Sequence, residues 1–418
     1  AHLLDEAMLK ACHKELSKGK APGIDRVTKE EYEANLNENI TNLVTRLKRK
    51  AYRPQPVRRT CIPKPGSDKM RPLGIPAYED KIVQLGLAKI LSAIYEADFL
   101  ACSFGFRPGR GCHDALKALS FLIETRKVNY IVDADIKGFF DHVDHEWLMK
   151  FLSHRVADPS IHRLIRRILK AGYLEEGTLH TTEEGTPQGG VISPLLANIY
   201  LHYALDLWFE KIVKESCRGE AYMVRYADDF VCCFQYKEDA EKFYRALQTR
   251  LSKFNLSIAA EKSKIIAFGR FAAGNAARQG KGKPATFDFL GFTHYCGISR
   301  TGKFRVKRKT SRKKYKAALS RMKAWIKHNR NMPVWELVAV WRSKLLGHYH
   351  YYGITDNGKM LSNFLYDTTR LLFKWLNRRS QRKSFDWEKF NLFLKKCQLP
   401  QPKIYVHIYD LKPHLGYS

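Results

Sequence analysis

Two apolar segments flank an acidic pair in the middle of the chain. Within residues 222–234, two segments rich in aromatic and β-branched residues flank Asp228 and Asp229. This pattern predicts strand, tight turn and strand, with both carboxylates at the tip of a hairpin. Because Asp is a common turn residue, the pair alone favours a structural role unless the fold brings a further carboxylate to it.

A second apolar segment, residues 128–136, is predicted to be a buried strand. Its period of two places Ile131, Asp133 and Asp135 on one face. Carboxylates that end an apolar strand are costly unless they meet a cation. We therefore expect Asp135 to face a charged ligand or partner.

Helical periodicity separates these strands and continues on both sides of them. Predicted helices cover residues 79–100, 145–154, 158–171 and 193–214, and another begins at Asp239. A strand and turn follow at residues 256–268. The order strand, helices, hairpin, helix, strand is typical of a split βαβ sheet of the ferredoxin type. In that topology the first strand neighbours the hairpin, so Asp135 would lie beside Asp228 and Asp229.

The two ends of the chain have different patterns. Residues 3–50 predict two helices, and residues 52–76 predict a hairpin that carries Lys64 and Arg71. Residues 269–284 are predicted to be a mobile linker rich in Gly, Ala and Lys. Three helices are predicted in the C-terminal part, at residues 311–328, 334–353 and 361–379.

The charge of the chain favours a polyanionic partner. The 418 residues include 73 Lys and Arg against 42 Asp and Glu, a formal net charge of +31. Residues 301–418 carry 27 basic and 6 acidic side chains, net +21, which leaves +10 for residues 1–300. Between residues 300 and 316, ten of 17 residues are Lys or Arg and none is acidic. Such a segment is expected to follow a phosphate backbone.

Cysteine usage and hydropathy favour an intracellular protein. The nine cysteines form no C-x-x-C pair and no zinc-type cluster, so we expect free thiols in a reducing compartment. The sequence has no secretory signal and no apolar span of 18 residues, and we expect no membrane partner. The expected location is the cytoplasm, in association with RNA or the nucleoid. Because the chain starts at Ala1, a processed or trimmed N-terminus is also expected.

Three carboxylates at one point would repel one another unless divalent cations neutralise them. Oxygen ligands without neighbouring Cys or His suit Mg²⁺, which also binds substrate phosphates. Two such ions can promote an in-line displacement at phosphorus, so nucleotidyl transfer is our functional hypothesis. The alternative is a turn Asp pair plus a buried Asp held by backbone donors.

Four motifs, in this order, resemble those of group II intron-encoded reverse transcriptases. They are residues 135–141, residues 185–198, Tyr226-Ala227-Asp228-Asp229 and Phe289-Leu290-Gly291-Phe292. The resemblance extends over nearly the whole chain. It implies an α+β fold of the right-hand polymerase type, with fingers, a ferredoxin-like antiparallel palm and a helical thumb, also called the maturase domain or domain X.

The resemblance also implies domain limits. Residues 1–50 would be an N-terminal extension, residues 51–127 fingers, and residues 128–299 a palm that includes part of the fingers. Residues 300–418 would be the basic helical thumb. The chain ends soon after Pro402, so we expect it to lack the endonuclease domain of some relatives and to take its primer from elsewhere.

The resemblance assigns roles at the catalytic centre. Asp135 and Asp228 would bind two Mg²⁺ ions, for which Mn²⁺ is a substitute, and Asp229 would support them. Lys262 would protonate the leaving pyrophosphate, although an exposed lysine after a helix is more often only solvated.

It assigns a nucleotide pocket as well. Lys64 and Arg71 would hold the incoming triphosphate, and Gln188 and Gly189 would line the pocket. Phe140 would exclude a ribose 2′-hydroxyl, its alternative role being core packing.

The resemblance and the basic segments together give the expected partners. Nucleic-acid contacts are predicted at the following residues: Arg107, Lys307, Arg308, Lys309, Arg312, Lys313 and Lys314. The partners would be an RNA template, a DNA or RNA primer, dNTPs and group II intron RNA, whose splicing and retrohoming by target-primed reverse transcription the protein would assist. A free-standing reverse transcriptase in defence or repair, and a non-enzymatic RNA-binding splicing factor, are the alternative functions.

Overall fold

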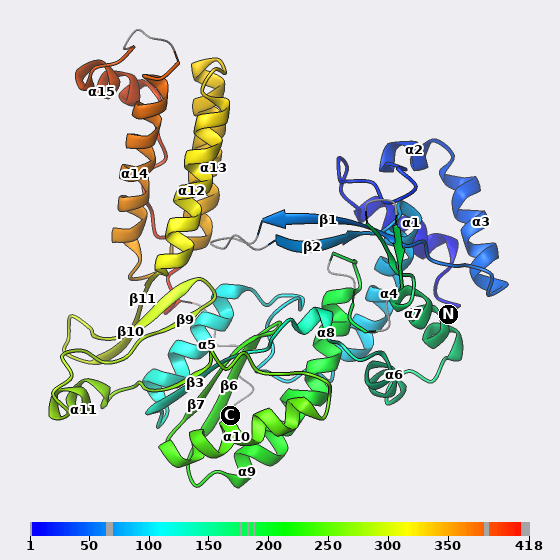
Figure 1. The fold of residues 1–418 in the computed structure, drawn as a ribbon, viewed down its shortest axis with the longest axis horizontal. Helices are drawn as coiled ribbons and strands as arrows, with labels where there is room; N and C mark the ends of the chain where they lie inside the picture. The colour runs from blue at the N-terminus through cyan, green and yellow to red at the C-terminus, as the bar shows by residue number, and fades with distance from the viewer. Residues whose placement is uncertain are drawn as a thin grey trace.

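The computed structural model describes residues 2–63, 70–175, 178–181, 184–186, 189–379 and 384–410. These residues form a mixed α and β protein with three separate sheets. Figure 1 shows the N-terminal helices on one side, a bundle of long helices on the other, and a central sheet between their bases.

The central sheet has the predicted ferredoxin-type topology. Its four strands lie in the order β6 (Ala221–Tyr226), β7 (Asp229–Phe234), β3 (Tyr130–Asp135) and β8 (Lys264–Ala267). Every neighbouring pair is antiparallel. Since helices connect β3 to β6 and β7 to β8, the arrangement is the split βαβ sheet that the sequence predicts.

Helices cover both faces of this sheet. On one face Phe243 and Leu247 of α10 (Lys237–Ser252) pack with Phe230 and Phe234 of β7 in the largest core. On the other face α5 (Cys112–Thr125) packs against the alternate residues of the same strands. The period of two in β7 therefore serves two cores, which explains why the strand is apolar throughout.

The predicted helix over residues 193–214 is not a regular α-helix. It begins as α8 (Ser193–Leu201), widens into π-helical turns at His202–Asp206 and Phe209–Val213, and ends as α9 (Lys214–Ser216). Turns of this type often occur at functional sites. Here the first of them carries the buried Asp206.

The N-terminal part contains more elements than predicted. Its helices are α1 (Glu6–Glu15), α2 (Lys29–Ala34), α3 (Leu36–Lys48) and α4 (Tyr78–Tyr95). The predicted hairpin is confirmed as β1 (Val57–Pro63) and β2 (Met70–Ile75). It belongs to a four-stranded sheet with β4 (Tyr173–Glu175) and β5 (Thr178–His180). The hairpin extends toward the C-terminal bundle (Figure 1).

Two further helices lie between β3 and the loop before α8. They are α6 (His145–Ser153) and α7 (Pro159–Leu169), close to the predicted limits. The Asp158 side chain accepts a hydrogen bond from the Ser160 backbone N–H, and Pro159 opens the helix. The N-cap and the N1 proline thus fix the start of α7, as the sequence indicates.

The third sheet joins the central sheet to the C-terminal bundle. It consists of β9 (Phe287–Phe289), β10 (Phe292–Ile298) and β11 (Phe304–Thr310), all antiparallel. The bundle contains α12 (Arg312–Asn329), α13 (Val334–Tyr352) and α14 (Gly358–Leu376), followed by α15 (Trp387–Lys396). It has its own core around the buried Trp341.

Several details of the prediction are wrong. The predicted linker contains a helix, α11 (Ala272–Arg278). Asp239 does not cap α10, because the helix begins at Lys237; instead the buried Asp239 accepts hydrogen bonds from the backbone N–H groups of Arg218 and Gly219.

In the part of the chain described above, none of the helices has the length and apolar character needed to span a bilayer.

Candidate active site

The predicted carboxylates meet at one end of the central sheet. Asp135, the last residue of β3, is the direct cross-strand partner of Asp229, the first residue of β7. Asp228 occupies the two-residue turn with Ala227, which has a φ of +57°. The fold therefore brings Asp135, Asp228 and Asp229 together across 93 residues of sequence, as predicted.

The cluster raises the pKa values of Asp228 and Asp229. Burial raises the pKa of Asp229 to about 7, and repulsion from Asp133, Asp228 and Asp135 adds to the rise. Burial also raises the pKa of Asp228, to which Asp135 contributes. Concentrated negative charge at a sheet end is the electrostatic condition under which a polyvalent cation or a cationic side chain is attracted.

Asp133 belongs to this cluster more closely than the sequence indicated. It lies two residues before Asp135 on the same strand face, and burial raises its pKa to about 6. Among the neighbouring carboxylates, Asp133 makes the largest contribution to the raised pKa of Asp229. The alternation along β3, which predicts Asp133 and Asp135 on one face, is the sequence signal for this position.

The hairpin formed by β9 and β10 closes the cluster from the other side. The backbone N–H of Leu290, in the turn of this hairpin, hydrogen-bonds the Asp229 carboxylate and opposes the rise in its pKa. Leu290 has a φ of +49° and is followed by Gly291 at +83°, which directs the turn toward β7. The Phe289-Leu290-Gly291-Phe292 motif is thus part of the candidate site.

Three cationic side chains interact electrostatically with the carboxylates. Lys262 Nζ lies 2.8 Å from Asp135 Oδ2, with 57% of the lysine side chain exposed. Arg71 of β2 opposes the rise in the pKa of Asp228. The pKa of Lys314 in α12 is lowered by partial desolvation of its ammonium group and by Lys313, while Asp229 opposes this change. Lys262, Arg71 and Lys314 therefore come from three different regions to one centre.

A glycine-bearing loop packs between the Phe139–Asp141 turn and β2. The Thr186 N–H donates to the Phe140 carbonyl at 2.8 Å, and the Val191 N–H donates to the buried Gln84 side chain at 2.9 Å. Gly189 has a φ of +108°, and a Cβ there would lie 2.6 Å from the Gly74 carbonyl oxygen. Only glycine allows this close approach to β2, the strand that carries Arg71.

Phe140 contacts this loop through its backbone carbonyl, which accepts the hydrogen bond from Thr186. It belongs to a 3₁₀ turn, Phe139–Asp141, and its ring meets Phe139 edge to face at a centroid distance of 5.3 Å. Its side chain is half-buried, in contrast to the buried Phe139. Two other predicted pocket residues, Lys64 and Gln188, lie outside the described residues.

The donor set fits a hard divalent cation in its chemistry but does not form a closed cage. Among the residues that the structure describes, no group of three or more His, Cys, Asp or Glu side chains is arranged to hold a metal ion. The Asp135 carboxylate is instead paired with Lys262. Because carboxylates and phosphates complete each other's coordination of Mg²⁺, Asp135 and Asp228 are the residues that would hold the ion with a bound nucleotide.

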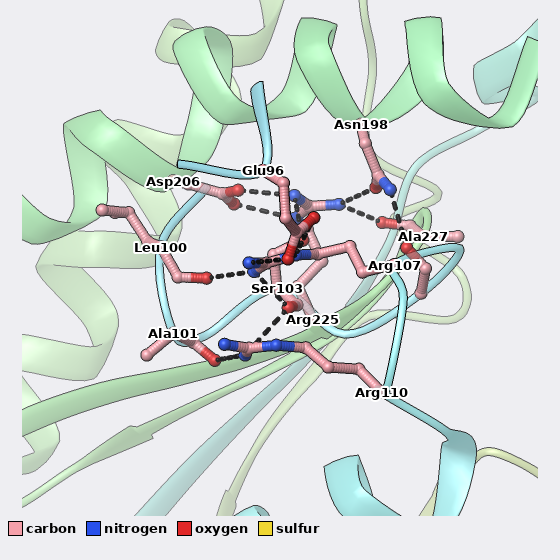
Figure 2. A network of polar contacts seen from close by, with 11 residues as sticks. Glu96, Leu100, Ala101, Ser103, Arg107, Arg110, Asn198, Asp206, Arg225 and Ala227 are labelled. Carbon is pink, nitrogen blue, oxygen red and sulfur yellow. Dashed lines mark hydrogen bonds and ion pairs between the residues drawn. The ribbon is translucent and has the colours of Figure 1, made fainter. Parts of the chain in front are cut away.

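A buried polar network around Arg225 supports the turn, and it was not predicted from the sequence. The Arg225 guanidinium donates to both oxygens of Asp206, to Asn198 Oδ1 at 3.0 Å, to Ser103 Oγ at 2.8 Å and to the Ala227 carbonyl at 2.9 Å. Arg225 and Asp206 are both 0% exposed. Figure 2 shows Arg225 between α8 and the turn, with Asp206 and Asn198 on its two sides.

Arg107 was predicted to contact nucleic acid, and the structure corrects this. Its guanidinium is 3% exposed and pairs with Glu96, and it also donates to the carbonyls of Leu100 and Ser103. Figure 2 shows these bonds next to the Arg225 network. Arg107 therefore holds its own loop and has no surface available for a phosphate.

Arg308 is the second correction. It is 0% exposed and donates to Ser120 Oγ and to the Val306 carbonyl. The basic segment is the strand β11, and its period of two turns Val306, Arg308 and Thr310 inward. The alternate Lys309 is exposed and Lys307 is half-buried.

The remaining predicted contacts lie at the start of α12. Arg312, Lys313 and Lys314 are exposed there. Ser311 caps the helix by accepting a hydrogen bond from the Lys314 N–H. The predicted cationic surface thus survives in part, on the edge of the bundle that adjoins the carboxylates.

This arrangement agrees with comparison to known proteins. The family model described as "Reverse transcriptase (RNA-dependent DNA polymerase)" matches residues 62–294, more than half of the chain. The protein therefore belongs to the reverse transcriptase family. Its relatives support the expected group II intron type.

Three relatives define this similarity. Group II intron-encoded protein LtrA of Lactococcus lactis subsp. cremoris is 49% identical over 165 residues, 40% of this chain and 27% of that protein. Protein YkfC of Escherichia coli (strain K12) is 37% identical over 239 residues, 50% of this chain and 62% of that protein. An uncharacterized 91 kDa protein in a cob intron of Schizosaccharomyces pombe is 42% identical over 176 residues, 42% of this chain and 21% of that protein. The matched segments span less than two thirds of each relative.

Proposed function

We propose that this protein is an RNA-directed DNA polymerase, which extends a DNA or RNA primer on an RNA template with dNTPs. The observation that carries the proposal is the pairing of Asp135 with Asp229 across β3 and β7, with Asp228 in the adjacent turn. Membership of the reverse transcriptase family supports it.

The proposed architecture is a right hand. Residues 51–127 would form fingers, residues 128–299 a palm and residues 300–418 a thumb, with residues 1–50 as an N-terminal extension. The central sheet, the β1–β2 hairpin and the helical bundle support this division (Figure 1). The bundle's separate core is consistent with a thumb that moves as a unit.

Divalent cations are the implied cofactors, and we propose Mg²⁺, with Mn²⁺ as a substitute, at Asp135 and Asp228. When bound, two such ions would activate the primer hydroxyl and stabilise the leaving pyrophosphate. Asp229 would act indirectly, since its carboxylate is held by the Leu290 N–H and repels the other two.

The cationic side chains would act on the nucleotide. Arg71, near Asp228, would bind the triphosphate and neutralise its charge. Lys262 forms an ion pair with Asp135, which raises its pKa and keeps it protonated. It would therefore be ready to donate a proton to pyrophosphate when the ion pair opens.

The pocket around the sugar would select deoxynucleotides. The glycine-bearing loop contacts both regions: the Thr186 N–H donates to the Phe140 carbonyl, and the backbone at Gly189 lies against β2, which carries Arg71. A phenyl ring beneath the sugar would exclude the 2′-hydroxyl by volume. Of the residues in the 3₁₀ turn, only Phe140 would then determine the selection of dNTP over rNTP.

Primer extension tests the proposal. The purified chain, given an annealed RNA template and DNA primer with dNTPs and Mg²⁺, is expected to synthesise cDNA. Omission of Mg²⁺, or the substitution Asp228→Asn, is expected to remove the product. Template-dependent extension by the Asp228→Asn variant at the wild-type rate would contradict the assignment.

A second function, binding of group II intron RNA to aid splicing and retrohoming, is favoured by two observations. One relative is named a group II intron-encoded protein, and the exposed cations at Arg312, Lys313 and Lys314 extend the surface beyond the carboxylates. A free-standing reverse transcriptase and a non-enzymatic splicing factor remain the alternatives. We also propose a cytoplasmic, RNA-associated location.

The two functions separate by mutation. Asp228→Asn is expected to remove cDNA synthesis and to leave intron RNA binding within about twofold of wild type, because binding depends on cations and not on the carboxylates. Intron RNA domains in the DNA that flanks the coding region would exclude the free-standing alternative. Loss of RNA binding together with synthesis would contradict two separate surfaces.

A further inference from the structure

The buried Arg225 contacts the catalytic turn directly, which gives it more than a packing role. Of its five hydrogen-bond partners, four are supports: the two Asp206 oxygens, Asn198 and Ser103. The fifth is the carbonyl of Ala227, the residue that precedes Asp228. The guanidinium therefore ties a rigid helix to the turn that presents a catalytic carboxylate.

The turn is also held from its other side. A Cβ on Gly105 would lie 2.4 Å from the Ala227 nitrogen, so the Gly105 backbone lies directly against the turn. Asn198 connects the two supports, because its Nδ2 donates to the Gly105 carbonyl at 2.6 Å while its Oδ1 accepts from Arg225. Arg225 and Gly105 thus form one rigid frame around Ala227.

The fold itself has little need of charge at this position. A buried ion pair can often be replaced by apolar residues of similar volume with no loss of stability, because desolvation offsets the Coulomb attraction. What an apolar pair cannot supply is a planar fork that holds five acceptors in fixed directions. The φ of +57° at Ala227, in a region that residues with a side chain rarely adopt, is a conformation that needs such support.

We propose that Arg225 is a positioning residue for catalysis: together with Asp206 and Asn198, it holds the Ala227 carbonyl so that the Asp228 carboxylate faces Asp135. This inference rests on the proposed polymerase function and adds the element that sets its geometry. Arg225 does not touch substrate. It acts through the direction of the turn.

The first variant keeps the charge and removes the fork. Arg225→Lys retains a cation for Asp206 but cannot reach all five acceptors. The kcat of primer extension is expected to fall about 100-fold, since small misplacements of catalytic groups have effects of this size. The KM for dNTP is expected to change less than about threefold, because Arg71 and the nucleotide pocket remain. The Mg²⁺ concentration for half-maximal rate is expected to rise.

The matched control is Arg250→Lys. Arg250 donates to the carbonyls of Tyr203 and Ala204, in the same π-helical segment that contains Asp206. Among the described residues, and unlike Arg225, it donates no hydrogen bond to the Ala227 turn. Its kcat and Mg²⁺ requirement are expected to match the wild type, whatever its melting temperature. A packing role for Arg225 would instead give both variants the same behaviour.

A second variant keeps the test decisive if Arg225→Lys does not fold. The double change Arg225→Met with Asp206→Leu removes both buried charges and is expected to melt near the wild-type temperature. Its kcat is nevertheless expected to fall about 100-fold, because the Ala227 carbonyl loses its donor. Wild-type kcat and Mg²⁺ requirement in a folded variant would overturn the inference. Absence of extension by the wild-type chain would instead reject the proposed polymerase function.

Discussion

Two aspartates close to one hairpin, Asp206 and Asp228, differ in whether a cationic side chain neutralises their charge. Asp206 is 0% exposed, and both of its oxygens accept hydrogen bonds from Arg225. Asp228, at the hairpin tip, has its pKa raised by burial and by the nearby Asp135. The first charge has a direct ion-pair partner inside the protein, whereas the second is offset only in part, by the charges of Arg71 and Arg225.

The difference separates geometry from chemistry. A compensated pair can hold a turn in place without attracting a ligand, whereas an uncompensated cluster attracts cations and costs stability. Since Arg225 links Asp206 to Ala227, the stable pair directly supports the costly cluster. Substitutions at the two aspartates are therefore expected to act on different properties.

The largest effect is expected from Asp228→Asn. Removal of this carboxylate should lower the rate of primer extension by roughly 10³-fold or more, because several kcal/mol of transition-state stabilisation are lost. Its melting temperature should stay at or above that of the wild type, since the change relieves repulsion with Asp135. Primer extension and thermal unfolding measure the two properties on one sample.

Asp206→Asn is the matched comparison. It leaves Arg225 buried without its counter-ion, which is expected to cost about 3–5 kcal/mol of folding free energy. The melting temperature should fall in this variant and not in Asp228→Asn. Equal thermal stability of the two variants would refute the distinction between compensated and uncompensated carboxylates.

Another buried aspartate, Asp80, sharpens the comparison. Its carboxylate accepts hydrogen bonds from the Tyr52 hydroxyl and the Gln55 N–H, which are neutral donors. Burial raises its pKa to about 6 from an ordinary value of 3.8. The folded protein therefore holds a proton on Asp80 that the unfolded chain releases, so the free energy of unfolding should fall by up to about 3 kcal/mol as pH rises from about 4 to above 6.

Asp80→Asn should remove this part of the pH dependence. The amide can accept from the Gln55 N–H and donate to the Tyr52 oxygen, as the protonated carboxyl does. Urea unfolding of wild type and variant across this pH range gives the difference. A difference that does not change with pH would show that Asp80 keeps its ordinary pKa in the folded protein.

The sequence predicted the cluster well because the topology fixes it. Once β3, β6 and β7 are recognised as strands of a ferredoxin-type sheet, Asp135 must end beside the hairpin. By contrast, Arg107, Arg225 and Arg308 could not be separated from surface arginines, since burial of a cation depends on partners such as Glu96 and Asp206 that lie elsewhere in the sequence.

The remaining errors have local physical causes. The burial of Arg308 was not predicted, because a run of basic residues hides the period of two that turns it inward in β11. The π-helical turn that carries Asp206 leaves the hydrophobic pattern of a helix almost unchanged. Contacts that involve backbone atoms, such as that of the Leu290 N–H with Asp229, leave no compositional signal.

The next largest effect is expected on the selectivity for dNTP over rNTP. Phe140→Ala should reduce discrimination between dNTP and rNTP by roughly 10- to 100-fold, the range typical of one pocket contact. Single-nucleotide incorporation kinetics with matched dNTP and rNTP measure the ratio. Phe139→Ala is a control in the same 3₁₀ turn, because Phe139 is buried in the core and should affect stability instead. Unchanged discrimination in Phe140→Ala would leave this ring with a packing role only.

The smallest effect is expected from Lys314→Ala, which tests how far the uncompensated cluster reaches. Lys314 lies in the helical bundle, yet its charge interacts with Asp229 of the central sheet and with Arg71 of β2. Loss of one exposed cation should weaken primer extension about threefold to tenfold, equivalent to about 1 kcal/mol. Because salt screens exposed charges, the gap from wild type should narrow as ionic strength rises. Lys323→Ala, an exposed position further along α12, is the matched control and should lose less. If both lysine variants lose activity equally at every salt concentration, Lys314 contributes only general positive charge, and the influence of the carboxylate cluster ends at the central sheet.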